Sequence, residues 1–153
     1  MTTFRPMDIE TFKRLDTESR ARRPKPFLLV PPDRIATEAE LDAVERAIGI
    51  RLPSSYRQFL ALFGGGSYGL SNVCSADSES DYYLPRKQAE ASAYLPPNLL
   101  IASDDFAGGA YVWVVEDGKA AERICYWHRD GGLTPTQFEN VLDFLGKFAY
   151  EAA

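Results

Sequence analysis

The sequence predicts an α+β fold in which N-terminal helices precede an antiparallel β-sheet meander and a C-terminal helix packs on the sheet. Three observations favour this order. Apolar residues recur at helical spacing up to residue 63, short β-branched and aromatic runs follow as far as residue 128, and helical spacing returns after residue 134. The chain has 153 residues, of which 45% are hydrophobic, so it suits one globular domain with its own core.

Residues 1–34 are expected to form a short helix followed by a basic arm. Phe12 and Leu15 have helical spacing. The arm, RARRPKPFLLVPPDR at residues 20–34, should run extended, because proline removes a hydrogen-bond donor and restricts the residue before it. The main domain is expected to follow at residues 35–153.

The next two segments predict helices joined by a short turn. Thr37 and Glu40 have the spacing of a capping box, and Gly49 provides a stop. The second helix begins near a proline that suits a first helical turn, and it ends before a glycine expected to act as a left-handed C-cap. The residues of this helix and glycine motif are Leu52, Pro53, Tyr56, Phe59, Gly64, Gly65 and Gly66.

The glycines Gly64, Gly66 and Gly69 match the letters G-x-G-x-x-G, which raises the question of a dinucleotide site. In such a site the glycines follow a strand and open a helix, whose N-terminus faces the pyrophosphate. Here they follow a helix and precede a strand-like run, so phosphates would meet carbonyl oxygens. The glycines are therefore interpreted as a helix stop with a tight turn, and no cofactor is expected.

The rest of the chain alternates strand-like and polar segments before a last helix. Strands are expected at 68–73, 99–102, 110–116 and 122–128, a polar loop at 75–81, a helix at 86–95, a turn at 104–109 and a hairpin loop at 117–119. A capping box of Thr134 and Gln137, with Pro135 at the first helical position, is expected to start the closing helix at 134–153.

The net charge of −5 conceals an asymmetry. Residues 1–34 carry 8 Lys and Arg against 5 Asp and Glu, whereas residues 35–153 carry 9 against 17. An acidic body disfavours nucleic acid and anionic membranes as partners and attracts basic proteins. Neither a signal peptide nor a transmembrane segment is visible, so the protein is expected in the cytoplasm, with Cys74 and Cys125 as reduced thiols.

No catalytic or metal site is expected. His128 is the only histidine, which excludes a multi-histidine metal site. On a continuous strand Cys125 and His128 face opposite sides, and Cys74 is more simply a small buried thiol than a nucleophile that approaches His128. The acidic runs at 77–81 and 104–105 could hold a cation or act as an acid–base pair, although a solvated edge and a turn need neither role.

The run TEAELDAVERAIGIRLPSSYRQFLALFGGG resembles the opening signature of the SUKH superfamily, the domain of fungal cell-wall synthesis regulators and of many bacterial immunity proteins. Three later segments are similar to the strands and closing helix of that family: NLLIASDDFAGGAYVWVV, ERICYWH and TPTQFENVLDFL. The resemblance covers about residues 35–148 and implies the α+β fold outlined above.

The resemblance implies a bacterial immunity protein that binds a cognate toxin of the nuclease or deaminase class and occludes its active site. The alternative is a non-enzymatic scaffold or regulatory module, as in the fungal relatives. A third class, an enzyme acting on a small ligand, would need a pocket that gathers Cys74, His128 and a carboxylate. The expected partner is a basic toxin protein, and the chain itself is expected to be a monomer or a weak homodimer.

The residues expected at the partner interface are acidic and aromatic. Carboxylates would meet basic groups of the toxin, and aromatic side chains would act as apolar anchors. The expected interface residues are Asp77, Glu79, Asp81, Asp104, Asp105, Glu116, Asp117, Tyr68, Tyr82, Tyr83 and Trp113.

Overall fold

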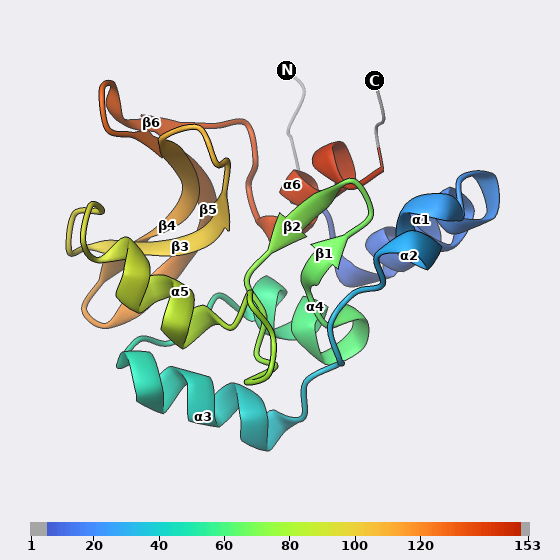
Figure 1. Ribbon diagram of the computed structural model, residues 1–153, viewed down its shortest axis with the longest axis horizontal. Coiled ribbons are helices and arrows are strands. Elements are labelled where there is room, and N and C mark those ends of the chain that lie inside the picture. Colours follow the sequence, from blue (N-terminus) through green and yellow to red (C-terminus); the bar gives the residue numbers. More distant parts are fainter. Residues whose placement is uncertain (1–5, 151–153) are drawn as a thin grey trace.

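The computed structural model describes residues 6–150 and confirms the α+β class (Figure 1). The helices are α1 (Ile9–Arg22), α2 (Lys25–Leu29), α3 (Glu38–Ile48), α4 (Ser54–Phe63), α5 (Leu84–Ala91) and α6 (Val141–Phe148). The strands are β1 (Gly66–Tyr68), β2 (Ser71–Val73), β3 (Leu99–Asp104), β4 (Gly109–Glu116), β5 (Lys119–His128) and β6 (Gly132–Pro135). None of the helices described is long and apolar enough to cross a membrane.

The strands form two antiparallel sheets in which neighbours in space are also neighbours in sequence. β1 and β2 form a hairpin, and β3 to β6 form a four-stranded sheet in the order β3-β4-β5-β6. The N–H of Cys74 donates to the Ala102 carbonyl over 2.8 Å. This bond places the end of the hairpin beside β3, so the whole β-region follows one meander.

Helices α4 and α6 cover one face of the larger sheet. The ring of Tyr111 on β4 lies 4.7 Å from that of Phe144 on α6. Two residues along β4, where the side chain returns to the same face, Trp113 is fully buried with its ring 4.6 Å from that of Tyr56 on α4. The closing helix therefore packs on the sheet as the sequence predicts.

The N-terminal helix packs into the same core. Phe12 of α1 is fully buried, with its ring 5.7 Å from Phe59 and 6.2 Å from Tyr68. The arm after it was expected to run extended. It does so only in part, because residues 25–29 form α2. Two of its four prolines, Pro24 and Pro26, lie at the start of that short helix, where the backbone N–H that proline lacks would have no helical acceptor.

The glycines after α4 make room for another part of the chain. A Cβ atom on Gly64 would lie 2.0 Å from the carbonyl oxygen of Asp33. Gly64 has a φ of 93°, positive as expected for a C-cap, but its ψ of −36° lies outside the left-handed helical region. The run follows a helix and leads into β1, so it does not open a helix as a dinucleotide site requires.

Two predicted elements differ in their bounds. The single strand expected at 68–73 contains the end of β1, the hairpin turn and all of β2, because Gly69 adopts a φ of 58° and the chain reverses between Tyr68 and Ser71. The helix expected at 86–95 is α5, which starts earlier, at Leu84.

The closing helix begins later than the capping-box pattern predicts. Residues 132–135 form β6, so Thr134 and Pro135 lie in an edge strand that pairs with β5, and Thr134 faces Tyr126. The free edge of β5 offers backbone hydrogen bonds that an isolated cap cannot match. Helix α6 starts instead after the N-cap Asn140. Residues 151–153, which the expected helix included, lie outside the described part of the chain.

Candidate functional site

The polar loop after β2 is closed at its base by backbone hydrogen bonds. The N–H of Ser75 donates to the Tyr82 carbonyl, and the N–H of Leu84 donates to the Ser75 carbonyl, each over 2.9 Å. Within the loop, the N–H of Ser80 donates to the Asp77 carbonyl over 3.0 Å. The acidic segment is therefore a closed loop that projects from the sheet.

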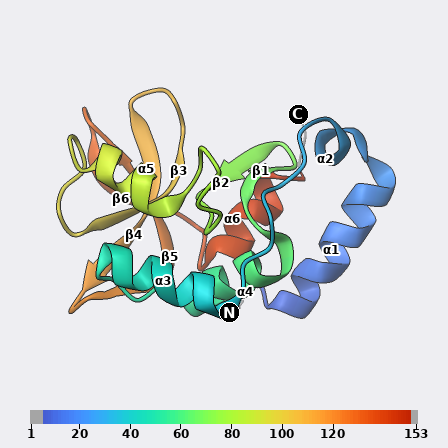
Figure 2. The ribbon, with the colours of Figure 1, turned by 60° about the horizontal axis from the view of Figure 1, so that its bottom comes forward.

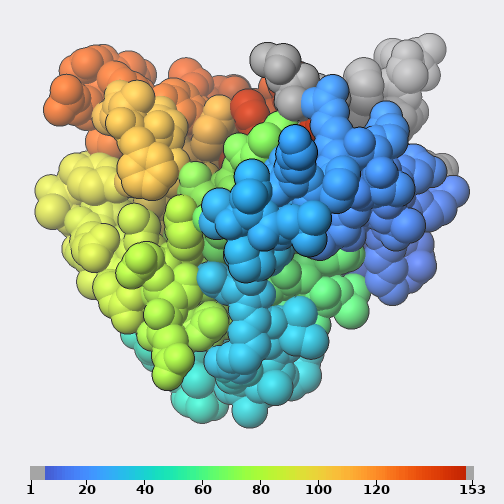
Figure 3. Space-filling model, turned by 45° about the vertical axis from the view of Figure 1, so that its right-hand side comes forward, coloured from blue at the N-terminus to red at the C-terminus, as the bar shows by residue number. Residues whose placement is uncertain are grey.

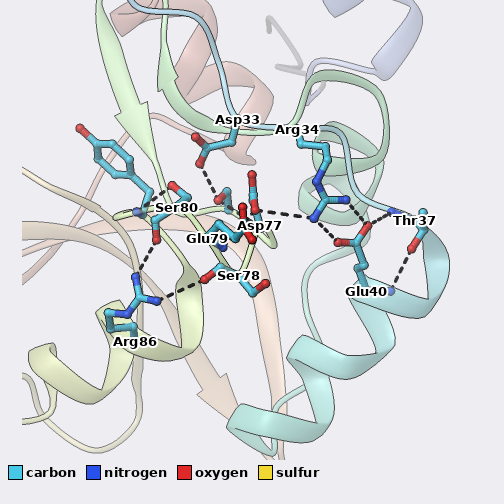
Figure 4. A network of polar contacts seen from close by, with 11 residues as sticks. Asp33, Arg34, Thr37, Glu40, Asp77, Ser78, Glu79, Ser80 and Arg86 are labelled. Carbon is cyan, nitrogen blue, oxygen red and sulfur yellow. Dashed lines mark hydrogen bonds and ion pairs between the residues drawn. The ribbon is translucent and has the colours of Figure 1, made fainter.

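Two arginines hold this loop from opposite sides (Figure 4). Arg86 of α5 donates to the carbonyl oxygens of Ser80 and Ser78 over 2.7 and 3.2 Å. On the other side, Arg34 lies 3.6 Å from the carboxylate of Asp77. Because Arg86 binds backbone carbonyls, it holds the loop in place without pairing with the charged side chains of the loop.

Arg34 also ties the loop to the start of α3. Its two terminal nitrogens donate to the two carboxylate oxygens of Glu40 over 2.9 and 2.6 Å, a bidentate geometry. Glu40 closes the capping box with Thr37 predicted from the sequence. The bond from Arg34, followed by that from the Thr37 N–H, lowers the pKa of Glu40 to about 2.

The glycine run contributes to this arrangement. The hydroxyl of Ser75 donates to the carboxylate of Asp33 over 2.7 Å. A Cβ atom on Gly66 would lie 2.4 Å from that carboxylate, so only glycine leaves space for it. The glycine run that matches the nucleotide-binding pattern thus leaves room for Asp33, and Asp33 anchors the acidic loop through Ser75.

The tip of the loop carries free negative charge. Glu79 and Asp81 are exposed, and neither forms an ion pair with any residue in the range 6–150. Asp77 is more enclosed, with a side-chain exposure of 16%, and it accepts the N–H of Glu79 over 3.1 Å. Asp77 therefore shapes the loop, whereas Glu79 and Asp81 present their charges to solvent.

Helix α3 adds carboxylates that the sequence-based list of site residues missed. Glu38 and Asp42 are 78% and 55% exposed. Both lie beside Arg57 of α4, at 2.7 and 3.2 Å, and Arg57 also reaches Glu45 at 2.7 Å. The single positive charge of Arg57 is shared by these three carboxylates, so this surface of the helix remains negatively charged. The high density of acidic residues in the sequence of α3 could have indicated that this helix contributes to an acidic surface.

The β4–β5 turn lies at the other end of α3 (Figure 2). The N–H of Arg51, just beyond the helix, donates to the Gly118 carbonyl over 2.8 Å. This turn carries the exposed carboxylates Glu116 and Asp117. Loop, helix and turn together form what we call the acidic face, made up of Glu38, Asp42, Asp77, Glu79, Asp81, Glu116 and Asp117.

The remaining acidic pair lies elsewhere. Asp104 ends β3 and Asp105 follows it, at the end of the sheet opposite to Glu116, because β4 runs from Gly109 to Glu116. Asp105 accepts the N–H of Ala107 and of Gly109 over 2.7 and 2.9 Å. These bonds give Asp105 a structural role in its turn, and the pair does not join the acidic face.

The aromatic residues divide by exposure. Tyr68 and Trp113 are fully buried, so neither offers surface to a partner. Tyr82 and Tyr83 are half-buried at the end of the acidic loop. The guanidinium of Arg86 lies 5.8 Å from the ring centre of Tyr83. Only the two tyrosines beside the loop are therefore placed to contact a molecule on the acidic face.

The residues of the helix and glycine motif are internal. Leu52, Tyr56 and Phe59 belong to the buried core. The hydroxyl of Tyr56 donates to the Cys74 carbonyl over 2.5 Å, which links α4 to the base of the acidic loop. Pro53 is the N-cap residue of α4. This motif supports the surface from below and does not contribute to it.

The thiols and the histidine are not arranged for nucleophilic catalysis. Burial raises the pKa of Cys74 to about 12, so its reactive thiolate form is disfavoured. Burial also raises the pKa of Cys125. The His128 ring accepts the N–H of Asp130 at Nδ1 over 3.1 Å, and its Nε2 lies 3.3 Å from the Ala107 carbonyl. A cavity beside Cys125 is lined by Arg51 but not by His128.

The carboxylates do not gather as ion ligands either. In the described part of the chain, no three His, Cys, Asp or Glu side chains lie close enough together to hold a metal ion. The carboxylates are spread over a surface, an arrangement suited to long-range attraction of a positively charged partner.

Comparison with known proteins identifies one family. The model of the SMI1 / KNR4 family (SUKH-1) matches residues 35–147, which is more than half of the chain. No curated protein matches the sequence. The match begins after α2 and spans the acidic face, the larger sheet and most of α6.

Proposed function

The chain belongs to the SMI1 / KNR4 family (SUKH-1), and we propose that it is an immunity protein that binds a basic toxin through its acidic face. In this proposal the toxin is a nuclease or a deaminase, and the bound protein occludes its active site. The family includes toxin-immunity proteins and fungal regulators, it is typically non-enzymatic, and it suggests protein–protein interaction.

The observation that carries the proposal is the acidic loop. Glu79 and Asp81 are exposed charges on a segment held by Arg34 and Arg86, so few loop conformations are lost on binding. A preorganised pair of carboxylates can pair with lysine or arginine side chains at little entropic cost. Half-buried Tyr82 and Tyr83 beside them supply apolar contact area.

The charge also fits the proposed partner class. Enzymes that act on nucleic acid use lysine and arginine to bind phosphates, so their substrate clefts are basic. An acidic surface competes for such a cleft, and complementary charge accelerates encounter at low ionic strength. The same acidic surface disfavours direct binding of nucleic acid to this protein.

The test reverses the charge of the loop tip. An immunity gene is expected to lie beside a large toxin gene, so the variant Glu79→Lys/Asp81→Lys is co-expressed with the product of that gene. Cell survival and complex formation are scored. We expect protection to be lost and the association rate at low salt to fall at least about tenfold, because attraction becomes repulsion. The control Glu18→Lys/Asp130→Lys makes the same change in net charge at exposed sites away from the acidic face.

The outcomes separate the alternatives. If the loop variant binds and protects like the unaltered protein while the control does too, the acidic face is not the interface. If the unaltered protein forms a complex without protecting cells, the scaffold or regulatory function is supported instead. Near-UV circular dichroism of each variant establishes that it retains its fold.

A further inference from the structure

A cavity of about 770 Å³ lies between α1, α2 and α6. Its volume falls within the range of ~300 to 1,000 Å³ typical of small-molecule sites. None of its lining residues belongs to the acidic face. Two of its three walls, α1 and α2, precede residue 35, where the family match begins, so the cavity depends in part on segments outside the matched range. Figure 3 shows the N-terminal segment in blue across the front of the molecule.

Facing stripes of α1 and α6 form two walls of the cavity. Leu15, Ser19 and Arg22 recur at intervals of four and three residues, so they share one face of α1. Gly146 of α6 lies against this part of the chain: a Cβ atom there would lie 3.0 Å from the Met7 side chain and 3.4 Å from that of Leu15. The absent side chain therefore lets α6 pack closely against Met7 and Leu15 at this wall of the cavity.

The apolar part of the lining comes from separate elements. Leu15 contributes from α1, Phe27 from α2 and Leu70 from the turn of the β1–β2 hairpin. Phe27 is held in place by Arg20, whose guanidinium lies 4.1 Å from the ring centre. The N–H of Leu70 donates to the Ala149 carbonyl over 3.0 Å. These walls are therefore fixed by contacts of their own.

The cavity also holds a polar side chain without a partner. Ser19 is 6% exposed, and its hydroxyl makes no hydrogen bond with any described residue. A helical serine commonly donates to a carbonyl one turn earlier, as the neighbouring Thr17 does to Lys13 over 3.0 Å. An unsatisfied buried hydroxyl is costly, and an acceptor bound in the cavity would satisfy it.

Positive charge lines the same end of α1. Arg22 and Arg23 are exposed and form no ion pair with any residue between 6 and 150, in contrast to Arg20, which binds Asp16 over 2.9 Å. The carboxylate that lines the cavity, Asp143, is already engaged by the N–H groups of Met7 and Glu139, over 3.2 and 3.1 Å. The contact with Met7 places it near the start of α1, about 20 Å along the helix from Arg22.

We propose that this cavity binds a small amphiphilic anion. Its apolar body would pack against Leu15, Phe27 and Leu70. Its carboxylate or phosphate would pair with Arg22 and Arg23 and accept a hydrogen bond from the Ser19 hydroxyl. Guanidinium groups suit both kinds of anion because they donate in a planar fork. This site is independent of toxin binding, since the acidic face shares none of its residues.

The probe is 8-anilinonaphthalene-1-sulfonate, which joins an aromatic body to one anionic group and fluoresces when it leaves water. Saturable binding to the full chain is expected. The variant Arg22→Gln/Arg23→Gln should weaken it about tenfold or more, through loss of charge-assisted hydrogen bonds. The control Arg14→Gln/Arg46→Gln removes the same charge from exposed helix positions outside the cavity and should change the affinity less than twofold.

Competition identifies the ligand chemistry. Decanoate and decyl phosphate should displace the probe whereas decanol should not, and the stronger of the two anions identifies carboxylate or phosphate as the natural group. Ser19→Ala, which keeps the fold because it removes only an unpaired hydroxyl, should weaken the binding of both anions. Non-saturable binding, equal loss in the control, or equal displacement by decanol would overturn the proposal.

Discussion

The Asp105 carboxylate accepts hydrogen bonds from the Tyr126 hydroxyl and from the N–H groups of Ala107 and Gly109. Burial raises the pKa of this carboxyl, but the three bonds outweigh it, so the pKa lies below its usual value. The same contact raises the pKa of Tyr126 to about 12. The bonds hold a turn in which Phe106 has a φ of 57°, a conformation that costs energy for a residue with a side chain.

Replacing this carboxylate should destabilise the protein in a pH-dependent way. Because the folded pKa of Asp105 is below the unfolded one, its contribution is present above about pH 4 and is lost as the pH falls through the folded pKa. We expect Asp105→Asn to lower the free energy of unfolding by about 1 kcal/mol at pH 7, since the group is only partly buried, and by less at pH 3. Urea unfolding at both pH values measures the difference.

Asp104→Asn is the matched control, because Asp104 accepts only the N–H of Phe106, over 2.6 Å. It should cost less than Asp105→Asn at pH 7. An equal loss for both variants, or a loss that does not shrink at low pH, would contradict the role assigned to Asp105.

Helix α6 depends on its N-cap. Asn140 is 5% exposed, its side-chain oxygen accepts the Asp143 N–H over 2.9 Å, and its side-chain amide donates to the Met7 carbonyl over 2.8 Å. One side chain thereby starts the helix and binds Met7, two residues before the start of α1. Thr134, the cap expected from the sequence, instead points its hydroxyl at the Tyr126 carbonyl from an exposed edge strand.

The two candidate caps can be compared by substitution. Asn140→Ala should lower the free energy of unfolding by about 2 kcal/mol, because it removes a cap and leaves a partly buried carbonyl unpaired. Thr134→Ala should change it by less than about 0.5 kcal/mol, as is usual at exposed sites. Thermal and urea unfolding of both variants provide the measurement. The reverse ranking would place the cap at Thr134 and contradict the position of α6.

The N-terminal helices share a core with the family domain. Phe12 packs against Tyr150 at 5.8 Å as well as against α4. The hydroxyl of Tyr150 donates to Asp16 of α1 over 3.0 Å, and Tyr68 also donates to Asp16. Burial, first among several causes, raises the pKa of both tyrosines, which keeps them protonated donors at neutral pH. Opposite ends of the chain are thus joined through one carboxylate.

This arrangement predicts that α1 and the sheet unfold together. Phe12→Ala should lower the free energy of unfolding by about 3 to 5 kcal/mol and shift one cooperative transition, as for a buried aromatic in a single core. Tryptophan fluorescence reports on the sheet through Trp113, and far-UV circular dichroism reports on the helices. Separate midpoints by the two methods would instead show that the N-terminal helix unfolds independently.

Much of the fold could be predicted because the local signals were strong. The capping box at Thr37, the stop at Gly49 and the aromatic strands all appear as predicted. The capping pattern at Thr134 was misleading because a threonine hydroxyl can serve a strand as well as a helix. The acidic loop could be placed on the surface by composition, but its neighbours on α3 could not, because they are distant in sequence.

The sequence by itself determined the α+β class, the family and the acidic character of the body, since these follow from local periodicity, short motifs and composition. The tertiary structure decided which charges lie together, which aromatic residues are buried and where a cavity remains. Those features depend on long-range contacts, such as Arg34 with Asp77 and Phe12 with Tyr150, in which the packing of whole elements overrides local preference.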